Sequence, residues 1–552
     1  MVIEALIKRA RPEIVEMKSY SSARSLHKGR EGLVFLDANE CPFEPYIGAE
    51  NLARYPDQQP VEVVNALCRL YGVSSRNLAV MRGADEAIDF LVRVFCAAGQ
   101  DNVIITPPTF TMYAQSAAIQ GVAVKEVLLK EGFGIDADSL KETADENTKI
   151  VFLCSPNNPT GTVIETTTTE EICAAFADRA LVILDETYIE YTARESLIPL
   201  IDKYDNLIVL RTLSKAYAAA GLRCGVTIAR PEIIELLLKV LPPYPLPQPV
   251  VQEVLRIFEV KNLKRLAEKR RELLNIKSAI IPELEMLDEV EAVFPSEVNF
   301  FFMRVKDVEV FCEKCLDGGI VIRNQSHQPG LENCVRISIG TQEEMNRLLS
   351  VLKGDVVESQ AGQRITTVTR KTSETAIAVR INLDAPTPVK ILTGIGFYDH
   401  MLEQIAKHGG FSLELECDGD LQIDPHHTVE DCAIALGEAL KQALDDKRGI
   451  GRFGFTVPMD ETLAHVALDL SGRFFLNFKG VFPAEKVGDL PTDMVEHVFR
   501  SLAENLQANL HIAVEGENTH HMVEACFKGF GRALRQAITK EGDVVPSTKG
   551  VL

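Results

Sequence analysis

Short apolar runs rich in β-branched residues alternate with helical patterns through the first two thirds of the chain. Buried strands separated by helices are typical of a parallel α/β sheet. Because parallel strands end along one edge of such a sheet, catalytic groups are expected where the runs end. The clearest runs are "NVIITPP", "KIVFLCSPNNPTG", "ALVILDETYIEY" and "NLIVLRTLSKAYAAAGLRCG".

The last third of the chain contains an internal repeat. Each copy has an acid followed by histidine, then a helical run, an alternating strand and a His-His-x-x-Glu sequence that opens another helical pattern. The intervals between the copies agree closely, since 497 − 400 = 97 and 520 − 426 = 94. We therefore predict an α+β domain made of two duplicated βα-type halves.

The two patterns meet at residues 352–364, where hydrophobic periodicity gives way to Gly, Ser, Gln and charge. A chain of 552 residues also exceeds the roughly 250 to 300 residues that one core supports. Nine of the eleven histidines follow this stretch. We predict an α/β domain at 1–355, a linker at 356–363 and the duplicated domain at 364–552.

Charge narrows the choice of partners. With 58 basic and 79 acidic residues the net charge is −21, which argues against nucleic acid and anionic membranes as partners. Apolar runs long enough to cross a bilayer are absent, and charges interrupt the N-terminal "MVIEALIKRARPEIVE", unlike a signal peptide. A cytoplasmic protein that acts on small molecules is expected.

The repeated histidine pairs predict a metal centre. Adjacent side chains on a helix diverge by about 100°, so paired histidines suit two different ions better than one. One isolated pair would more simply be a solvated helix start, but the repetition favours metal binding. Which histidine joins which glutamate stays open. Two sites of three imidazoles and one carboxylate would use His400, His426, His427, Glu430, His497, His520, His521 and Glu524, with manganese favoured over zinc or iron.

From Arg364 onward the chain resembles imidazoleglycerol-phosphate dehydratase. The matching motifs include "TGIGFYDHMLEQIAKHG", "GDLQIDPHHTVEDCAIALGEAL", "PMDETLA" and "PSTKG". The resemblance implies a two-manganese site that holds the substrate imidazole, with Glu374 and Lys528 handling protons and Gln404 contacting substrate. It also implies that Arg452, Arg473, Ser547 and Lys549 bind phosphate, which suits their charge and hydrogen-bonding groups.

The α/β part places a lysine, an aspartate, an asparagine and a tyrosine at strand ends. Lys215, Asp185, Asn158 and Tyr188 together match the requirements of a pyridoxal phosphate site. The lysine would hold the cofactor as a Schiff base, the aspartate would keep the pyridine nitrogen protonated, and the other two would bond the ring hydroxyl. The "GADEAI" sequence would open a helix whose free N–H groups receive the phosphate.

This part resembles fold-type I aminotransferases, and more closely histidinol-phosphate aminotransferase. The motifs "LDANECPFEP", "RGADEAID", "CSPNNPTGT", "RTLSKAYAAAGLRCG" and "CVRISIGT" carry the likeness. It implies that Ala84, Asp85, Thr212, Ser214 and Arg223 hold the cofactor phosphate, with Tyr55 reaching from a dimer mate and Phe110 stacking on the ring. It further implies that Tyr20, Asn39, Arg323 and Arg336 contact substrate.

The two resemblances together imply one chain that performs two successive steps of histidine biosynthesis on phosphorylated imidazole substrates, with glutamate as amino donor. The families further imply a homo-oligomer, as an aminotransferase dimer and a dehydratase shell of 24 subunits. Two alternatives stay open: a related pyridoxal enzyme, such as an aromatic aminotransferase or a phosphothreonine decarboxylase, or a degenerate half that only supports assembly.

Overall fold

The computed structural model describes residues 2–17, 52–354, 364–455, 458–459, 461–542 and 545–546. Its contacts divide the chain into two compact units, Met1–Val357 and Glu358–Leu552. The predicted linker at 356–363 lies outside the described residues, and so do Tyr20, Asn39, Ser547 and Lys549.

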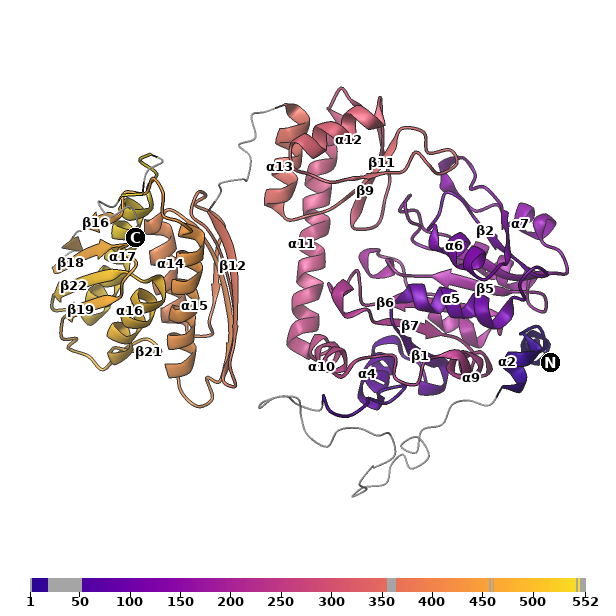
Figure 1. The fold of residues 1–552 in the computed structure, drawn as a ribbon, viewed down its shortest axis with the longest axis horizontal. Helices are drawn as coiled ribbons and strands as arrows, with labels where there is room; N and C mark the ends of the chain where they lie inside the picture. Colours follow the sequence, from indigo (N-terminus) through magenta and orange to yellow (C-terminus); the bar gives the residue numbers. More distant parts are fainter. Residues whose placement is uncertain are drawn as a thin grey trace, which may run out of the picture. The chain divides into compact units, whose positions relative to one another are not determined.

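A seven-stranded sheet forms the centre of the first unit (Figure 1). Its order is β1-β7-β6-β5-β4-β2-β3, and β7 alone in this order runs antiparallel to its neighbours. Apart from the edge strand β3, the strands are short, mainly apolar runs that are buried along most of their length, as a sheet covered on both faces requires. They are β1 Leu78–Met81, β2 Asn102–Ile105, β3 Ala123–Glu126, β4 Thr148–Cys154, β5 Leu181–Asp185, β6 Leu207–Thr212 and β7 Gly225–Ile228.

Helices cover both faces of this sheet, and the alternation of strand side chains assigns each helix to one face. One core contains α1, α2, α5, α6 and α9, and the other contains α4, α7, α8 and α10. The bounds are α1 Val2–Lys8, α2 Pro12–Glu16, α4 Val61–Tyr71, α5 Ala84–Phe95, α6 Met112–Ile119, α7 Ala137–Thr143, α8 Thr166–Ala175, α9 Pro231–Val240 and α10 Gln248–Ile257.

A smaller sheet completes the first unit, in the order β10-β11-β9-β8. It packs through one core with the long helix α11 and with α12 and α13. Its elements are α11 Val260–Glu285, β8 Val290–Phe294, β9 Phe300–Val305, α12 Val308–Asp317, β10 Arg323–Asn324, β11 Cys334–Ser338 and α13 Gln342–Lys353. The predicted α/β domain with a mainly parallel sheet is confirmed.

The second unit contains two sheets with the same connectivity. One has the order β12-β13-β15-β14 and the other β16-β18-β22-β19, and in each the last pair is parallel. The strands are β12 Ile365–Lys371, β13 Thr375–Asn382, β14 Val389–Leu392, β15 Ser412–Gly419, β16 Phe453–Phe455, β17 Pro458–Met459, β18 Thr462–Asp469, β19 Phe475–Lys479 and β22 Asn509–Glu515, with a small hairpin of β20 Lys486–Val487 and β21 Leu490–Pro491. The predicted duplication is confirmed.

Four helices lie between these sheets, two from each half (Figure 1). They are α14 Gly396–Gly409, α15 His426–Leu444, α16 Asp493–Leu506 and α17 Thr519–Ile538. The helices pack across the halves, α15 on α16 and α14 on α17. A glycine permits each approach, because a Cβ at Gly437 would lie 2.7 Å from the Leu502 carbonyl oxygen and one at Gly531 would lie 2.8 Å from that of Ile405.

Candidate active sites of the two units

Polar side chains gather at the strand ends of the large sheet, where the sequence predicts them. Asp185 is the last residue of β5 and Thr212 the last residue of β6. Lys215 follows three residues after β6, and Asn158 lies four residues after the end of β4. Because β4, β5 and β6 are adjacent and parallel, their ends bring these groups to one edge.

Asp185 is held in place by two residues that sequence reasoning missed. The Tyr113 hydroxyl donates to Asp185 Oδ2 at 2.8 Å, and the Thr187 amide donates to Oδ1 at 3.0 Å. Asp185 is only 3% exposed, and this burial raises its pKa while the hydrogen bonds oppose the rise. Tyr113 lies at the start of α6 in "TFTMYAQ", where local sequence does not mark it as functional.

A cradle for an anion forms where the start of α5 meets the loop after β6. An Arg223 terminal nitrogen lies 3.3 Å from Asp85 Oδ2, and its other terminal nitrogen lies 3.5 Å from Ser214 Oγ. Thr212 Oγ1 donates to the same Ser214 oxygen at 3.0 Å. Gly83 allows this approach, since a Cβ there would lie 2.8 Å from Arg223. Ala84 and Asp85 belong to the first turn of α5, so Arg223 links the start of this helix to Ser214 and, through Ser214, to Thr212. The first N–H groups of a helix have no partner within it and suit an anion.

Lys215 is exposed, and the charges of Asp85 and Arg223 in this cradle act on its amine. Its Nζ lies 5.7 Å from the ring centre of the buried Tyr188. The amine is reached by solvent, yet partial desolvation lowers its pKa, and the nearby guanidinium of Arg336 lowers it further. A lysine with a lowered pKa keeps more of its amine neutral and nucleophilic.

The smaller sheet of the unit supplies the arginines expected to bind substrate. Arg336 donates to the side-chain oxygen of Asn158, which links β11 to the loop after β4. Arg323 is its register partner across the β10–β11 pair. Tyr55 is half exposed and stacks on Tyr244 with ring centres 4.4 Å apart. Phe110, by contrast, is partly buried and contacts Tyr113 edge-on.

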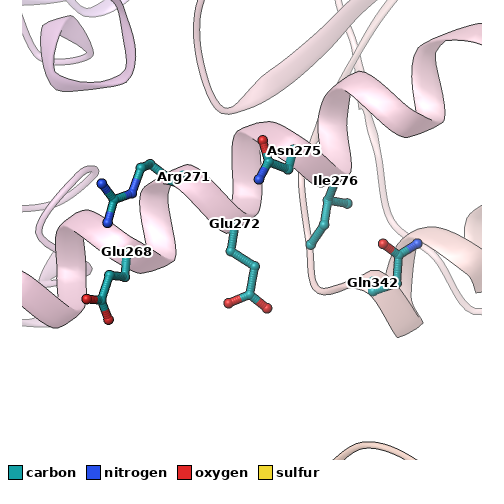
Figure 2. Close-up of a pocket in the computed structure, with 6 residues that line it drawn as sticks. All are labelled: Glu268, Arg271, Glu272, Asn275, Ile276 and Gln342. Atoms are coloured by element: carbon teal, nitrogen blue, oxygen red, sulfur yellow. The ribbon is translucent and has the colours of Figure 1, made fainter.

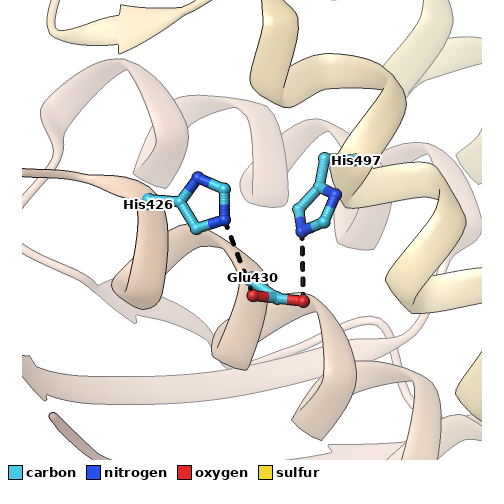
Figure 3. A group of neighbouring side chains, drawn as sticks. All are labelled: His426, Glu430 and His497. Atoms are coloured by element: carbon cyan, nitrogen blue, oxygen red, sulfur yellow. Dashed lines mark ion pairs between the residues drawn. The ribbon is translucent and has the colours of Figure 1, made fainter.

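In the second unit, helix packing brings ligands from the two halves together. The Glu430 carboxylate on α15 lies 3.1 Å from His497 Nε2 on α16 and 3.7 Å from His426 Nε2 (Figure 3). Ligand atoms of these three residues all lie within 4.8 Å of one another. This arrangement of two imidazoles and a carboxylate fits a divalent metal such as manganese, iron or zinc.

The pseudo-symmetric position holds the matching group. Glu524 on α17 lies 3.7 Å from His520 Nε2 and 3.7 Å from His400 Nε2 on α14. Lys528 Nζ contacts Glu524 Oε1 at 2.9 Å, and Gln404 lies 3.4 Å from His400 Nδ1. Each glutamate therefore joins the first histidine of its own pair and the acid-following histidine of the other half, a pairing that sequence left open.

The second histidine of each pair points elsewhere. The rings of His426 and His427 are nearly perpendicular, at 84°, and those of His520 and His521 at 87°. His427 Nδ1 lies 3.0 Å from Asp420 Oδ2, while its Nε2 lies 4.0 Å from Glu374. The hydrogen bond from His427 to Asp420 raises the pKa of this histidine.

His521 has an equivalent neighbour. Its Nδ1 lies 3.0 Å from Glu461 Oε2, and the hydrogen bond lowers the pKa of that carboxyl. Sequence reasoning did not single out Asp420 or Glu461. A comparison of "SETAIAV" with "DETLAHV" would have detected Glu461, since this aligns it with Glu374.

The arginines expected to bind phosphate have different surroundings. Arg452 is engaged by Asp469, with contacts of 2.7 and 3.2 Å, and donates to the Pro546 carbonyl at 2.9 Å. Arg473 is exposed in a shallow depression on the outer side of the second sheet, beside Phe474 and Phe475. The structure thus brings Arg452 next to the C-terminal segment but does not join it to Arg473 directly.

Another concavity lies on the outer side of α11, with a volume of about 450 Å³. Figure 2 shows it between α11 side chains such as Glu272 and Ile276 and Gln342 at the start of α13. The residues that line it are not those that the sequence singled out. None of the described helices is long and apolar enough to span a bilayer.

Fold and site together define a pyridoxal-dependent transferase of fold type I joined to a duplicated metal-binding α+β domain. Residues 44–352 match the family described as aminotransferase class I and II, and residues 393–534 match imidazoleglycerol-phosphate dehydratase. The chain is 38% identical over 343 residues to histidinol-phosphate aminotransferase of Blochmanniella floridana, which covers 62% of this chain and 95% of that protein.

Two further known proteins are similar to the aminotransferase part of the chain. The putative histidine biosynthesis bifunctional protein HisCD of Photorhabdus laumondii subsp. laumondii is 40% identical over 345 residues, which make up 62% of this chain and 42% of that protein. The histidinol-phosphate aminotransferase from Sinorhizobium meliloti, solved with pyridoxal-5'-phosphate, aligns over 62% of this chain and 98% of its own with a TM-score of 0.51. At 23% identity this structure supports the fold alone.

The chain belongs to the histidinol-phosphate aminotransferase family and carries an imidazoleglycerol-phosphate dehydratase domain after it. The predicted fusion of two histidine-biosynthesis enzymes is confirmed. Membership implies pyridoxal phosphate in the first unit and a metal in the second, and the side chains described above fit both groups.

Proposed function

We propose that the two units catalyse consecutive reactions with the residues assembled at their sites. The second unit removes water from imidazole glycerol phosphate and yields imidazole-acetol phosphate. The first unit then transfers an amino group from glutamate to this ketone and yields histidinol phosphate and 2-oxoglutarate. The chemistry sets the order, because a transaminase needs a carbonyl group and the dehydration creates one.

In the first unit, pyridoxal phosphate supplies an electron sink when it is bound. Lys215 holds the cofactor covalently and moves a proton at the substrate carbon, for which its lowered pKa is suited. Asp185, oriented by Tyr113 and Thr187, keeps a negative charge against the ring nitrogen. Arg336 and Arg323 bind the carboxylate and phosphate groups of the alternating substrates, as their shared side of the small sheet allows.

In the second unit, two Mn²⁺ ions are the proposed metals, with zinc or iron as alternatives. The observation that carries this proposal is the pair of pseudo-symmetric histidine and glutamate groups, built from opposite halves. Bound metal polarises the substrate imidazole and so favours loss of a carbon-bound proton. Glu374 and Lys528 handle the protons, and Gln404 contacts substrate from beside His400.

Phosphate recognition is assigned to Arg452, Arg473, Ser547 and Lys549. Arg452 supports the C-terminal segment through its hydrogen bond to the carbonyl of Pro546, the residue before Ser547.

Oligomerisation is part of the proposal. The first unit would form a dimer in which Tyr55 serves the site of the second subunit, and the second unit would form a shell of 24 subunits. Native mass spectrometry tests both states. The cytoplasmic location expected from the sequence stays a prediction.

Purified protein provides the first test. We expect visible cofactor absorbance that borohydride fixes on Lys215, and about two equivalents of manganese or a rival metal per chain by elemental analysis, since two ligand groups are present. Absence of either group would contradict the assignment for that unit.

Single substitutions separate the two activities. Lys215→Ala is expected to abolish transamination and leave dehydration intact, while His427→Ala is expected to do the reverse. A variant that retained its own reaction at the wild-type rate would refute the role given to that residue.

Tethering of the two units is expected to shorten the lag before histidinol phosphate appears, because it raises the local concentration of the intermediate. An equal lag with separated units would show that the product is not passed on directly.

A further inference from the structure

Two carboxylates occupy the same position relative to the second histidine of each pair. Asp420 Oδ2 lies 3.0 Å from His427 Nδ1, and Glu461 lies 3.0 and 3.1 Å from His521 Nδ1 through its two oxygens. An ionised carboxylate only accepts hydrogen bonds, so Nδ1 of each imidazole must carry the proton. The remaining nitrogen, Nε2, then presents its lone pair.

These carboxylates come from different places in the two halves. Asp420 follows the end of β15 after Gly419, and the residue in the matching place after β22 and Gly516 is Glu517. Glu517 is exposed, whereas Asp420 is largely buried, with a side chain 11% exposed. Glu461, which precedes β18, instead corresponds to Glu374, which precedes β13.

The exchange of positions argues against a chance contact. Simple inheritance of one loop geometry by both halves would place Asp420 and Glu517 on the histidines, or Glu374 and Glu461. In the structure each half supplies the carboxylate from a different element, yet the same ring nitrogen is held at the same distance. The arrangement also leaves Glu374 unused in this role, 4.0 Å from Nε2 of His427.

We propose that Asp420 and Glu461 are positioning residues that fix His427 and His521 in the Nδ1-protonated tautomer, so that Nε2 of each is aimed at a metal ion. The inference rests on the proposed function of the histidines as metal ligands. Carboxylates that hold metal-binding histidines in this way typically contribute about 10- to 100-fold to metal affinity. Because Asp420 holds His427, Glu374 is left for proton handling. The second half has no such separate residue, since Glu461, the counterpart of Glu374, holds His521.

Mn²⁺ binding to the full-length protein tests the proposal, followed by the electron paramagnetic resonance of free Mn²⁺. Asp420→Ala and Glu461→Ala are each expected to weaken binding by about 10- to 100-fold. Asp420→Asn should lose less, since its amide oxygen still accepts from Nδ1. Glu517→Ala and Asp418→Ala are matched controls from the corresponding loop and the neighbouring strand end, and both should bind as wild type does.

The tautomer is measured separately in metal-free protein labelled with ¹⁵N-histidine, by solid-state NMR above the histidine pKa. Nδ1-protonated signals assigned to His427 and His521 are expected, with the His427 signal shifting toward the Nε2-protonated form in Asp420→Ala. Wild-type Mn²⁺ affinity in Asp420→Ala and Glu461→Ala, or Nε2-protonated signals in wild type, would overturn the inference. Failure of the wild type to bind Mn²⁺ would instead overturn the proposed metal and leave the tautomer measurement to decide the inference.

Discussion

The two halves of the second unit keep the same scaffold but differ at single positions beside their histidine and glutamate clusters. Both have a four-strand order with a parallel last pair, a helix entered at His-His-x-x-Glu and a glycine seven residues after the glutamate. They differ at the fourth residue after that glutamate, which is Ile434 in one half and Lys528 in the other. Duplication thus preserves two equivalent clusters of histidine and glutamate, while a single position beside them is apolar in one half and basic in the other.

Lys528→Ile gives the second half the residue of the first and is the strongest way to test this difference. Loss of its proton transfer is expected to reduce dehydration by about 10²- to 10⁴-fold. Metal binding should persist or tighten, because the ammonium that lies 2.9 Å from Glu524 is removed. Steady-state kinetics and Mn²⁺ binding measure the two effects.

The exposed Lys479 on β19 offers a control in the same half. Lys479→Ile should leave dehydration unchanged. If Lys528→Ile retained full dehydration, or lost its metal in proportion to its activity, the lysine would be structural and the two halves would be chemically alike.

Sequence could predict the repeat and its ligands, because both depend on local order along the chain. The His-His-x-x-Glu sequences mark helix starts, and their diverging side chains follow from helix geometry. The pairing of Glu430 with His497 could not be predicted, since it depends on which helices pack, and this packing is permitted by Gly437 and Gly531.

The same limit applies to supporting residues. Asp420 precedes His426 by six residues and Glu517 precedes His520 by three, so loops of unequal length carry them to different places. Similarly, Tyr113 reaches Asp185 from 72 residues away, and only the packing of α6 on the sheet brings them together. In contrast, the positions of Asp185 and Lys215 could be predicted, because these residues lie at or just after the ends of strands that the apolar runs mark.

The two helix crossings are expected to be of equal importance. An added Cβ at Gly437 or Gly531 meets backbone oxygen at 2.7 or 2.8 Å, so the partner helix must shift. Overpacking of this kind costs about 1–3 kcal/mol. Gly437→Ala and Gly531→Ala should therefore lower the free energy of unfolding by similar amounts, measured by chemical denaturation of the metal-free protein.

Gly396→Ala is the control, since its Cβ would only contact Asp489 at 3.7 Å. A small effect of one substitution and a large effect of the other would contradict this expectation. It would show that one helix crossing contributes most of the stability, although the two crossings are related by pseudo-symmetry.

The smallest expected difference between the halves concerns pH. His408 is eight residues after His400 and packs against Gly531, and the equivalent residue after His497 is Asn505, which packs against Gly437. Desolvation lowers the pKa of His408 from the usual 6.5, and the cations Lys528 and Arg532 lower it further, against an opposing effect of Glu524. The unfolded chain therefore takes up this proton more readily than the folded one.

Stability linked to His408 is complete above about pH 6.5 and is lost as the pH falls through that value toward the lower folded pKa. His408→Asn copies the other half and removes this loss. We expect the melting temperatures of metal-free wild type and His408→Asn to differ by a constant amount at pH 7–8, and the variant to gain on wild type as the pH is lowered to about 5. A difference that stays constant across this range would mean that His408 titrates normally, and that its replacement by asparagine in the other half has no electrostatic consequence.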